Sequence, residues 1–165
     1  MPERSADTPP IHQTKVSRAI YGLVTVLAVL QVLQLHPDSA RTSAVTLFGT
    51  TLAVALIDAY SESIAVMLSR GRSISRAEWR GILDEVAPVI VGAQAPTIVL
   101  LASVLGLLSH ETALDIAELV AFALLFVYGL RVGQLLHTSK VRWVLSGLML
   151  VAIGALIVGF KAALH

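Results

Sequence analysis

The sequence has no cysteine, few charged residues and few aromatic residues, and each shortage excludes a class of chemistry. Without cysteine there are no disulfides, no thiolate metal sites and no cysteine nucleophile. Aromatic residues make up 5% of the chain, which leaves no aromatic platforms for sugars or bases. The net charge of +1 gives no indication of a nucleic-acid partner. Only 14% of the 165 residues are charged and 56% are hydrophobic, a balance that does not fit an ordinary soluble domain.

Recognisable catalytic motifs are missing as well. The serines form no G-x-S-x-G elbow, and the sequence contains no phosphate-binding loop. The five histidines fall in tails or at the ends of predicted helices, and none pairs at i, i+4, which argues against a histidine metal site. We therefore expect neither an enzyme nor a bound cofactor.

The apolar residues instead come in blocks of about twenty, the length that spans roughly 30 Å of hydrocarbon. The blocks cover about 16–35, 44–69, 88–108, 116–136 and 143–164. They predict an all-α integral membrane protein with a five-helix transmembrane domain over residues 16–165. Residues 1–15 are polar and proline-rich, which predicts a disordered cytoplasmic tail. Gln31 and Gln34, near the outer end of the first helix, are expected to face water or lipid headgroups.

A charged segment separates the second and third blocks. Ser75 and Glu78 have the spacing of a capping box, and apolar residues then recur with helical spacing at positions 79, 82, 83 and 86. This pattern predicts a short amphipathic cytoplasmic helix over about 75–87, with Trp79 at the level of the headgroups. Pro88 indicates a break before the third membrane helix. The alternative is that this segment forms the first turns of that helix.

The basic residues predict the orientation, because cytoplasmic loops of membrane proteins are rich in lysine and arginine. One side carries Arg4, Lys15, Arg18, Arg70, Arg72, Arg76, Arg80, Arg131, Lys140 and Arg142. The other side carries only Arg41 and Lys161. We therefore expect a cytoplasmic N-terminus, a C-terminus outside, and a location in the plasma membrane. The arginines at 70, 72, 76 and 80 are expected to contact anionic lipid.

Asp58 and Glu62 are the candidate metal ligands. They lie near the middle of the 44–69 block and four residues apart, so a helix places them on one face. An acid near the bilayer centre costs roughly 2.5–3.5 kcal/mol on insertion scales, so two on one face point to a function. Carboxylate oxygens suit Mg, Mn, Fe(II) or Ca.

A structural ion pair is the alternative for Glu62. Arg131, in the fourth block, is expected at a similar depth, roughly 10 Å from the cytoplasmic end. A Glu62–Arg131 pair would join two helices without transporting anything. For Asp58 no partner at matched depth is visible, and its alternative is a protonated carboxyl that hydrogen-bonds to a neighbouring helix.

Three residues of the third block are candidate lining of a pathway: Gln94, Pro96 and Thr97. Proline at position 96 frees the carbonyl of Gly92, which inside a membrane needs a neighbour, water or an ion. A proline inside a helix usually produces a simple kink, and the alternative interpretation is that these residues line a cavity.

The five spans, the orientation and the acids in the second helix resemble the vacuolar iron transporter (CCC1-like) family. Residues 22–25 resemble the family's D-G-L-[VI]-[ST] start, Gly92 with Pro96 resembles its G-G-x-x-P, and Gly129 to Gly133 followed by residues 146–148 resembles its G-x-K-G-x-L and S-G-L runs. The first-helix aspartate of the family is Tyr21 here. The segment 70–85 is net basic, where the family has a long glutamate-rich cytoplasmic domain.

The resemblance implies a homodimer with a path at its interface. We expect a transporter-like protein that exchanges a divalent metal, Fe or Mn, for protons at Asp58 and Glu62, with the cation as transported substrate. The alternative is a non-transporting membrane scaffold or assembly protein with a structural Glu62–Arg131 pair.

Overall fold

Five α-helices make up the part of the chain that the structure describes. This computed structural model describes residues 11–35, 39–136 and 139–163. The helices are α1 (Ile11–Leu35), α2 (Ala40–Arg70), α3 (Arg76–Val104), α4 (His110–Leu135) and α5 (Lys140–Ala163). The predicted all-α class is therefore confirmed. Of the predicted tail, residues 1–10 lie outside the described residues, whereas residues 11–15 belong to α1.

Four of these helices are long and apolar enough to cross a membrane. They are α1 from Lys15 onward, α2, α3 and α4. The chain therefore has the helices of a multi-pass integral membrane protein. Within the described residues α5 is not among them, so the prediction of five spans is borne out for four helices.

Serine side chains set the start of three helices. Ser39, Ser75 and Ser109 each accept a hydrogen bond from the backbone N–H three residues later, which satisfies one of the free N–H groups of a first turn. At Ser75 the predicted capping box is present, because the Glu78 carboxylate also accepts from the Ser75 backbone N–H. Gly71 ends α2 in the left-handed region, with φ of 62°, which favours glycine. The segment 71–75 therefore makes a tight turn between α2 and α3.

The predicted break at Pro88 is wrong, because α3 continues through it. Residues 76–87 form the first turns of α3, which was the alternative interpretation. The apolar stripe of this segment packs on α2: Ile82, Val86 and Val89 are buried in one cluster with Ala55 and Ala59. This packing offsets the backbone hydrogen bond that proline removes from a helix.

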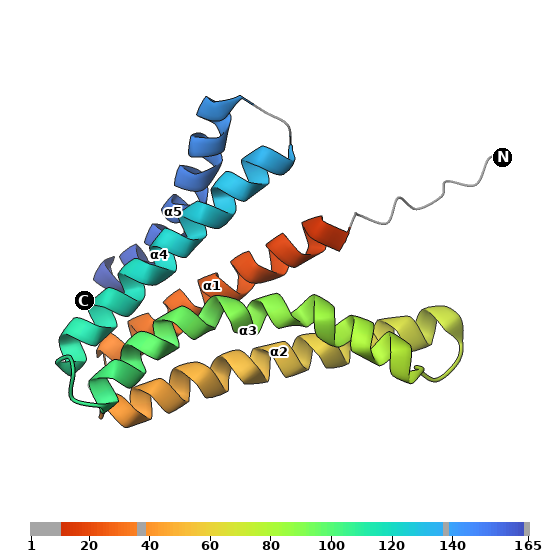
Figure 1. Ribbon diagram of the computed structural model, residues 1–165, viewed down its shortest axis with the longest axis horizontal. Coiled ribbons are helices and arrows are strands. Elements are labelled where there is room, and N and C mark those ends of the chain that lie inside the picture. Colours follow the sequence, from red (N-terminus) through yellow and green to blue (C-terminus); the bar gives the residue numbers. More distant parts are fainter. Residues whose placement is uncertain (1–10, 36–38, 137–138, 164–165) are drawn as a thin grey trace.

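The helices form a splayed bundle around α1. Helices α1, α2 and α3 run side by side, and α4 and α5 lean away from them as a hairpin (Figure 1). Helix α1 contacts all four others, and its side chains at Leu23, Val26, Leu27 and Leu30 are fully buried. The α2/α3 hairpin extends past the start of α1 (Figure 1). The molecule therefore has one gathered end and one open end, with the two hairpins diverging at the open end.

Two helix crossings depend on glycine. A Cβ added at Gly22 of α1 would lie 2.8 Å from the Val89 carbonyl oxygen of α3. One added at Gly129 of α4 would lie 2.5 Å from the Gly147 Cα of α5. In both places the obstacle is backbone, which cannot rotate aside as a side chain does. Small residues at these crossings allow the close approach by which membrane helices associate.

Candidate functional site

Asp58 and Glu62 do lie on one face of α2, and both face an arginine of α1. The Arg18 Nη1 donates to Asp58 Oδ2 at 2.7 Å, and Arg18 Nη2 donates to Glu62 Oε2 at 3.0 Å. Glu85 of α3 approaches the same Nη2 at 3.6 Å. We call these four residues the Arg18 cluster. It joins α1, α2 and α3 through a single guanidinium, whose planar fork of N–H donors suits several carboxylates at once.

In the Arg18 cluster the arginine is largely buried and the three acids are partly exposed. The Arg18 side chain is 14% exposed, whereas those of Asp58, Glu62 and Glu85 are 33%, 39% and 37% exposed. An enclosed guanidinium requires paired carboxylates, because an unpaired charge out of water is costly. One side of each acid therefore remains exposed, while the Arg18 guanidinium partly neutralises the negative charge from the buried side.

The Arg18 cluster lies well away from the gathered end of the bundle. At about 1.5 Å per residue, Asp58 lies about 27 Å along α2 from Ala40, Arg18 about 26 Å along α1 from Leu35, and Glu85 about 29 Å along α3 from Val104. A hydrocarbon core is about 30 Å thick. If those helix ends mark one boundary of the core, the whole cluster lies near the other. The acids then avoid most of the cost of burial at the bilayer centre.

The predicted Glu62–Arg131 pair is wrong. Arg131 is exposed on α4, and among the described residues the ion-pair partner of Glu62 is Arg18. The reason is the packing of α4, which lies against α1, α3 and α5 and leans away from α2 (Figure 1). Arg18 was counted among the cytoplasmic basic residues because the first span was predicted to begin at residue 16, but α1 begins at Ile11, so Arg18 lies within a helix that contacts α2.

The metal prediction at Asp58 and Glu62 stays a prediction. Within the described ranges, no group of three or more histidine, aspartate or glutamate residues is arranged to hold a metal ion. The inward-facing oxygens of both acids are bonded to Arg18. A cation bound there would have to displace the guanidinium or bind on the exposed side.

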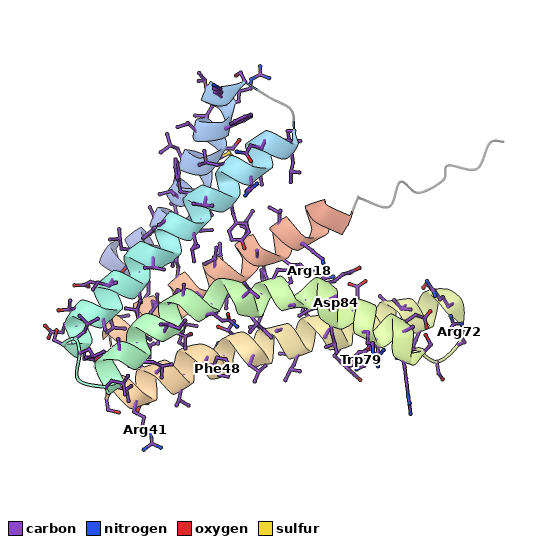
Figure 2. All side chains as sticks on the ribbon, viewed as in Figure 1. Arg18, Arg41, Phe48, Arg72, Trp79 and Asp84 are labelled. Atoms are coloured by element: carbon purple, nitrogen blue, oxygen red, sulfur yellow. The ribbon has the colours of Figure 1, made fainter. Side chains whose placement is uncertain are left out.

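The candidate pathway residues lie away from these acids. Pro96 and Thr97 are buried in α3, and the Thr97 hydroxyl donates to the Ala93 carbonyl at 2.7 Å. Gln94 is exposed about 14 Å along α3 from Glu85. It lines an apolar groove of about 500 Å³ between α2 and α3, together with Phe48. Figure 2 shows Phe48 on α2 far from Arg18, which agrees with this separation.

The tip of the α2/α3 hairpin carries a second group of charges. Glu78 bonds to Arg70 and, at 2.7 and 3.0 Å, to both terminal nitrogens of Arg72. The hydrogen bond and the charge of Glu78 raise the pKa of Arg72 above its usual value. Of the four arginines expected to contact anionic lipid, only Arg76 and Arg80 have no ion-pair partner in the described part of the chain. Figure 2 places Trp79 and Arg72 at this tip and Arg41 at the opposite end of the molecule.

Polar groups at the gathered end were not recognised from the sequence. Gln31 is 6% exposed, and neither atom of its amide has a hydrogen-bond partner among the described residues, so the expectation that it faces water or headgroups is wrong. The Gln34 amide donates to Glu118 Oε2 of α4 at 2.8 Å. The Ser43 hydroxyl and His110 Nε2 lie 3.3 Å apart. The periodicity of α1 was the available signal, because Gln31 lies one turn from Leu27 on its buried side.

Comparison of the chain with family models, with curated proteins and with solved structures finds no match.

Proposed function

We propose that this chain is a membrane scaffold or assembly protein that associates with a second copy of itself in the bilayer. The Arg18 cluster is the observation that carries the proposal. Asp58 and Glu62 are the acids on which transport would depend, and both are bonded to an enclosed arginine that ties three helices together. Such an arrangement suits a structural clamp better than an open cation site.

The α2/α3 groove supports self-association. Gln94 lies about 15 Å along α3 from Val104, close to the centre of a 30 Å core, and its side chain has no hydrogen-bond partner among the described residues. A polar side chain at that depth is stabilised by hydrogen bonds across a helix interface. A glutamine amide both donates and accepts, so two copies of Gln94 satisfy each other across a two-fold axis.

The opposite wall of the groove permits a close approach. Gly49 lines it, and no atom of another helix lies within 4 Å of the position that a Cβ would take there. Ala53, one turn further along α2, is also exposed, so it forms a small-xxx-small pair with Gly49. We propose this face of α2 and α3 as the dimer interface.

Replacing Gln94 by leucine should weaken dimerisation in liposomes roughly tenfold, from the 1–2 kcal/mol typical of hydrogen bonds between membrane helices. Energy transfer between labelled copies, followed as lipid is added, measures this. Gln134→Leu, the same change at an exposed glutamine of α4, is the matched control and should have no effect. A dimer unchanged by both Gln94→Leu and Gly49→Leu would contradict the proposed interface.

The proposal includes the orientation and the fifth helix. We place the basic end in the cytoplasm of a cell bounded by the plasma membrane, because cytoplasmic loops carry most lysine and arginine. We also propose that α5 crosses with α4, to which it is joined at the Gly129–Gly147 crossing. The C-terminus then lies outside.

Exchange of Fe or Mn for protons is the second candidate, and one observation favours it. Three partly exposed carboxylates share one guanidinium, which leaves an excess of negative charge on the outward side of the cluster. In that case Asp58 and Glu62 take the cation as Arg18 moves aside.

Metal uptake into proteoliposomes separates the two functions. The assembly role predicts uptake of Fe(II) and Mn(II) no faster than into empty liposomes, for the native protein and for Asp58→Asn and Glu62→Gln alike. Uptake by the native protein that falls at least tenfold in both variants would instead establish the exchanger.

A further inference from the structure

A second apolar groove lies at the open end of the bundle, away from the Gln94 face. It has a volume of about 450 Å³ and is lined by all three helices that meet there: Val16 and Ile20 of α1, Val132 of α4, and Met149 and Ile153 of α5. Figure 1 shows that α4 and α5 diverge from α1 toward this end. The volume falls within the range of about 300–1,000 Å³ that is usual for small-molecule sites.

The end of the bundle where this groove lies carries three basic residues. Arg142 is one helical turn before Ser146, which lines the groove, and Lys15 and Arg131 are next in sequence to the lining residues Val16 and Val132. In the described part of the chain none of these three cations forms an ion pair, unlike Arg18, Arg70 and Arg72. The three unpaired charges come from the same three helices as the apolar lining.

We propose that the groove binds an anionic phospholipid from the leaflet at the basic end. Its apolar lining accepts an acyl chain, and the phosphate lies among Lys15, Arg131 and Arg142. Each lysine or arginine near a membrane surface contributes about 1 kcal/mol toward anionic lipid. The positive charge at this end of the bundle favours this occupant over a transmembrane helix, whose apolar surface would gain nothing from three cations. The proposal goes beyond the assembly role and does not depend on it.

The site is tested with native mass spectrometry of the detergent-solubilised full chain. The probes are phosphatidylglycerol and phosphatidylcholine with identical acyl chains. We expect one phosphatidylglycerol to be retained in preference to phosphatidylcholine. Arg142→Gln and Lys15→Gln should each reduce that preference about fivefold. Arg41→Gln, which removes an exposed charge at the other end of the molecule, is the control and should leave it unchanged.

The groove itself is tested by filling it. Met149→Trp places a large side chain in the lining and should reduce binding of both lipids, and Ile153→Trp serves the same purpose if the first variant does not fold. Leu148→Trp, on the same helix but outside the lining, should bind as the native protein does. Equal retention of the two lipids by the native protein would overturn the proposal. So would phosphatidylglycerol binding that is unaffected in both filled variants, or a groove occupied by a second copy of the chain.

Discussion

Replacing Arg18 by glutamine is expected to lower the thermal unfolding midpoint of the detergent-solubilised protein by about 4–8 °C. The substitution leaves three carboxylates facing one another without a cation. Breaking a fully buried ion pair costs 3–5 kcal/mol, and exposed pairs contribute less than about 1 kcal/mol. Because the acids here are a third or more exposed, we expect Arg18→Gln to lower the free energy of unfolding by about 2 kcal/mol. For a protein of this size each kcal/mol lowers the midpoint by about 2–4 °C.

Arg41→Gln is the control for this result. Arg41 is exposed at the start of α2, and in the part of the chain that the structure describes it forms no ion pair. Surface substitutions of this kind change stability by less than about 0.5 kcal/mol. A midpoint that falls as far in Arg41→Gln as in Arg18→Gln would show that loss of any positive charge is sufficient, and that the cluster is not a specific clamp.

Replacing Gly129 by leucine should have the largest effect on the fold. The new side chain would meet the Cα of Gly147 and the carbonyl oxygen of Ser146, so α4 and α5 must separate. Overpacking usually costs about 1–3 kcal/mol, and a clash of backbone with backbone lies at or above the upper end of that range. We expect the midpoint to fall by at least 6 °C, as measured by circular dichroism.

Gly81→Ala is the matched control for a glycine change in a helix. No atom of another helix lies within 4 Å of the position that a Cβ would take at Gly81, and alanine is favoured over glycine in a helix by up to about 1 kcal/mol. The two substitutions should therefore change stability in opposite directions. A Gly129→Leu protein as stable as the native one would contradict the described crossing of α4 and α5.

These glycines also bear on the resemblance to the vacuolar iron transporter family. Gly22, Gly129 and Gly147 each come from a short motif on which that resemblance was based, and each lies at a helix crossing. Gly92 likewise faces α1: a Cβ added at Gly92 would lie 3.4 Å from the Cγ of Leu23. Close packing of membrane helices explains these residues without any shared metal chemistry. The family assignment stays a prediction.

The sequence predicted the number and order of the helices, because long apolar blocks are local signals, as is the serine cap at Ser75. It also singled out Asp58 and Glu62, since two acids on one helix face are recognisable from spacing alone. The partner of these acids was not predictable in the same way. The depth criterion selected Arg131 and left Arg18 among the cytoplasmic basic residues, and only the arrangement of α1 and α4 around α2 and α3 shows that Arg18 is the partner.

Pro88 and Gln31 are two further positions at which a local signal gave a wrong prediction. The preference of proline for helix ends predicted a break, but the tertiary contacts of Ile82 and Val86 with α2 maintain the helix. The polarity of Gln31 predicted exposure, but the rotation of α1 about its axis buries it. Local propensity does not specify either the neighbours of a helix or its rotation.

A double-mutant cycle between Arg18 and Glu62 is the sharpest test of whether the acids of α2 are held in ion pairs by an arginine. Unfolding free energies are compared for the native protein, Arg18→Gln, Glu62→Gln and the double variant. We expect a coupling of about 1 kcal/mol or more, so that the double variant loses clearly less unfolding free energy than the two single losses together. Losses that simply add would mean that Glu62 does not depend on Arg18 and that the two residues do not form a stabilising pair.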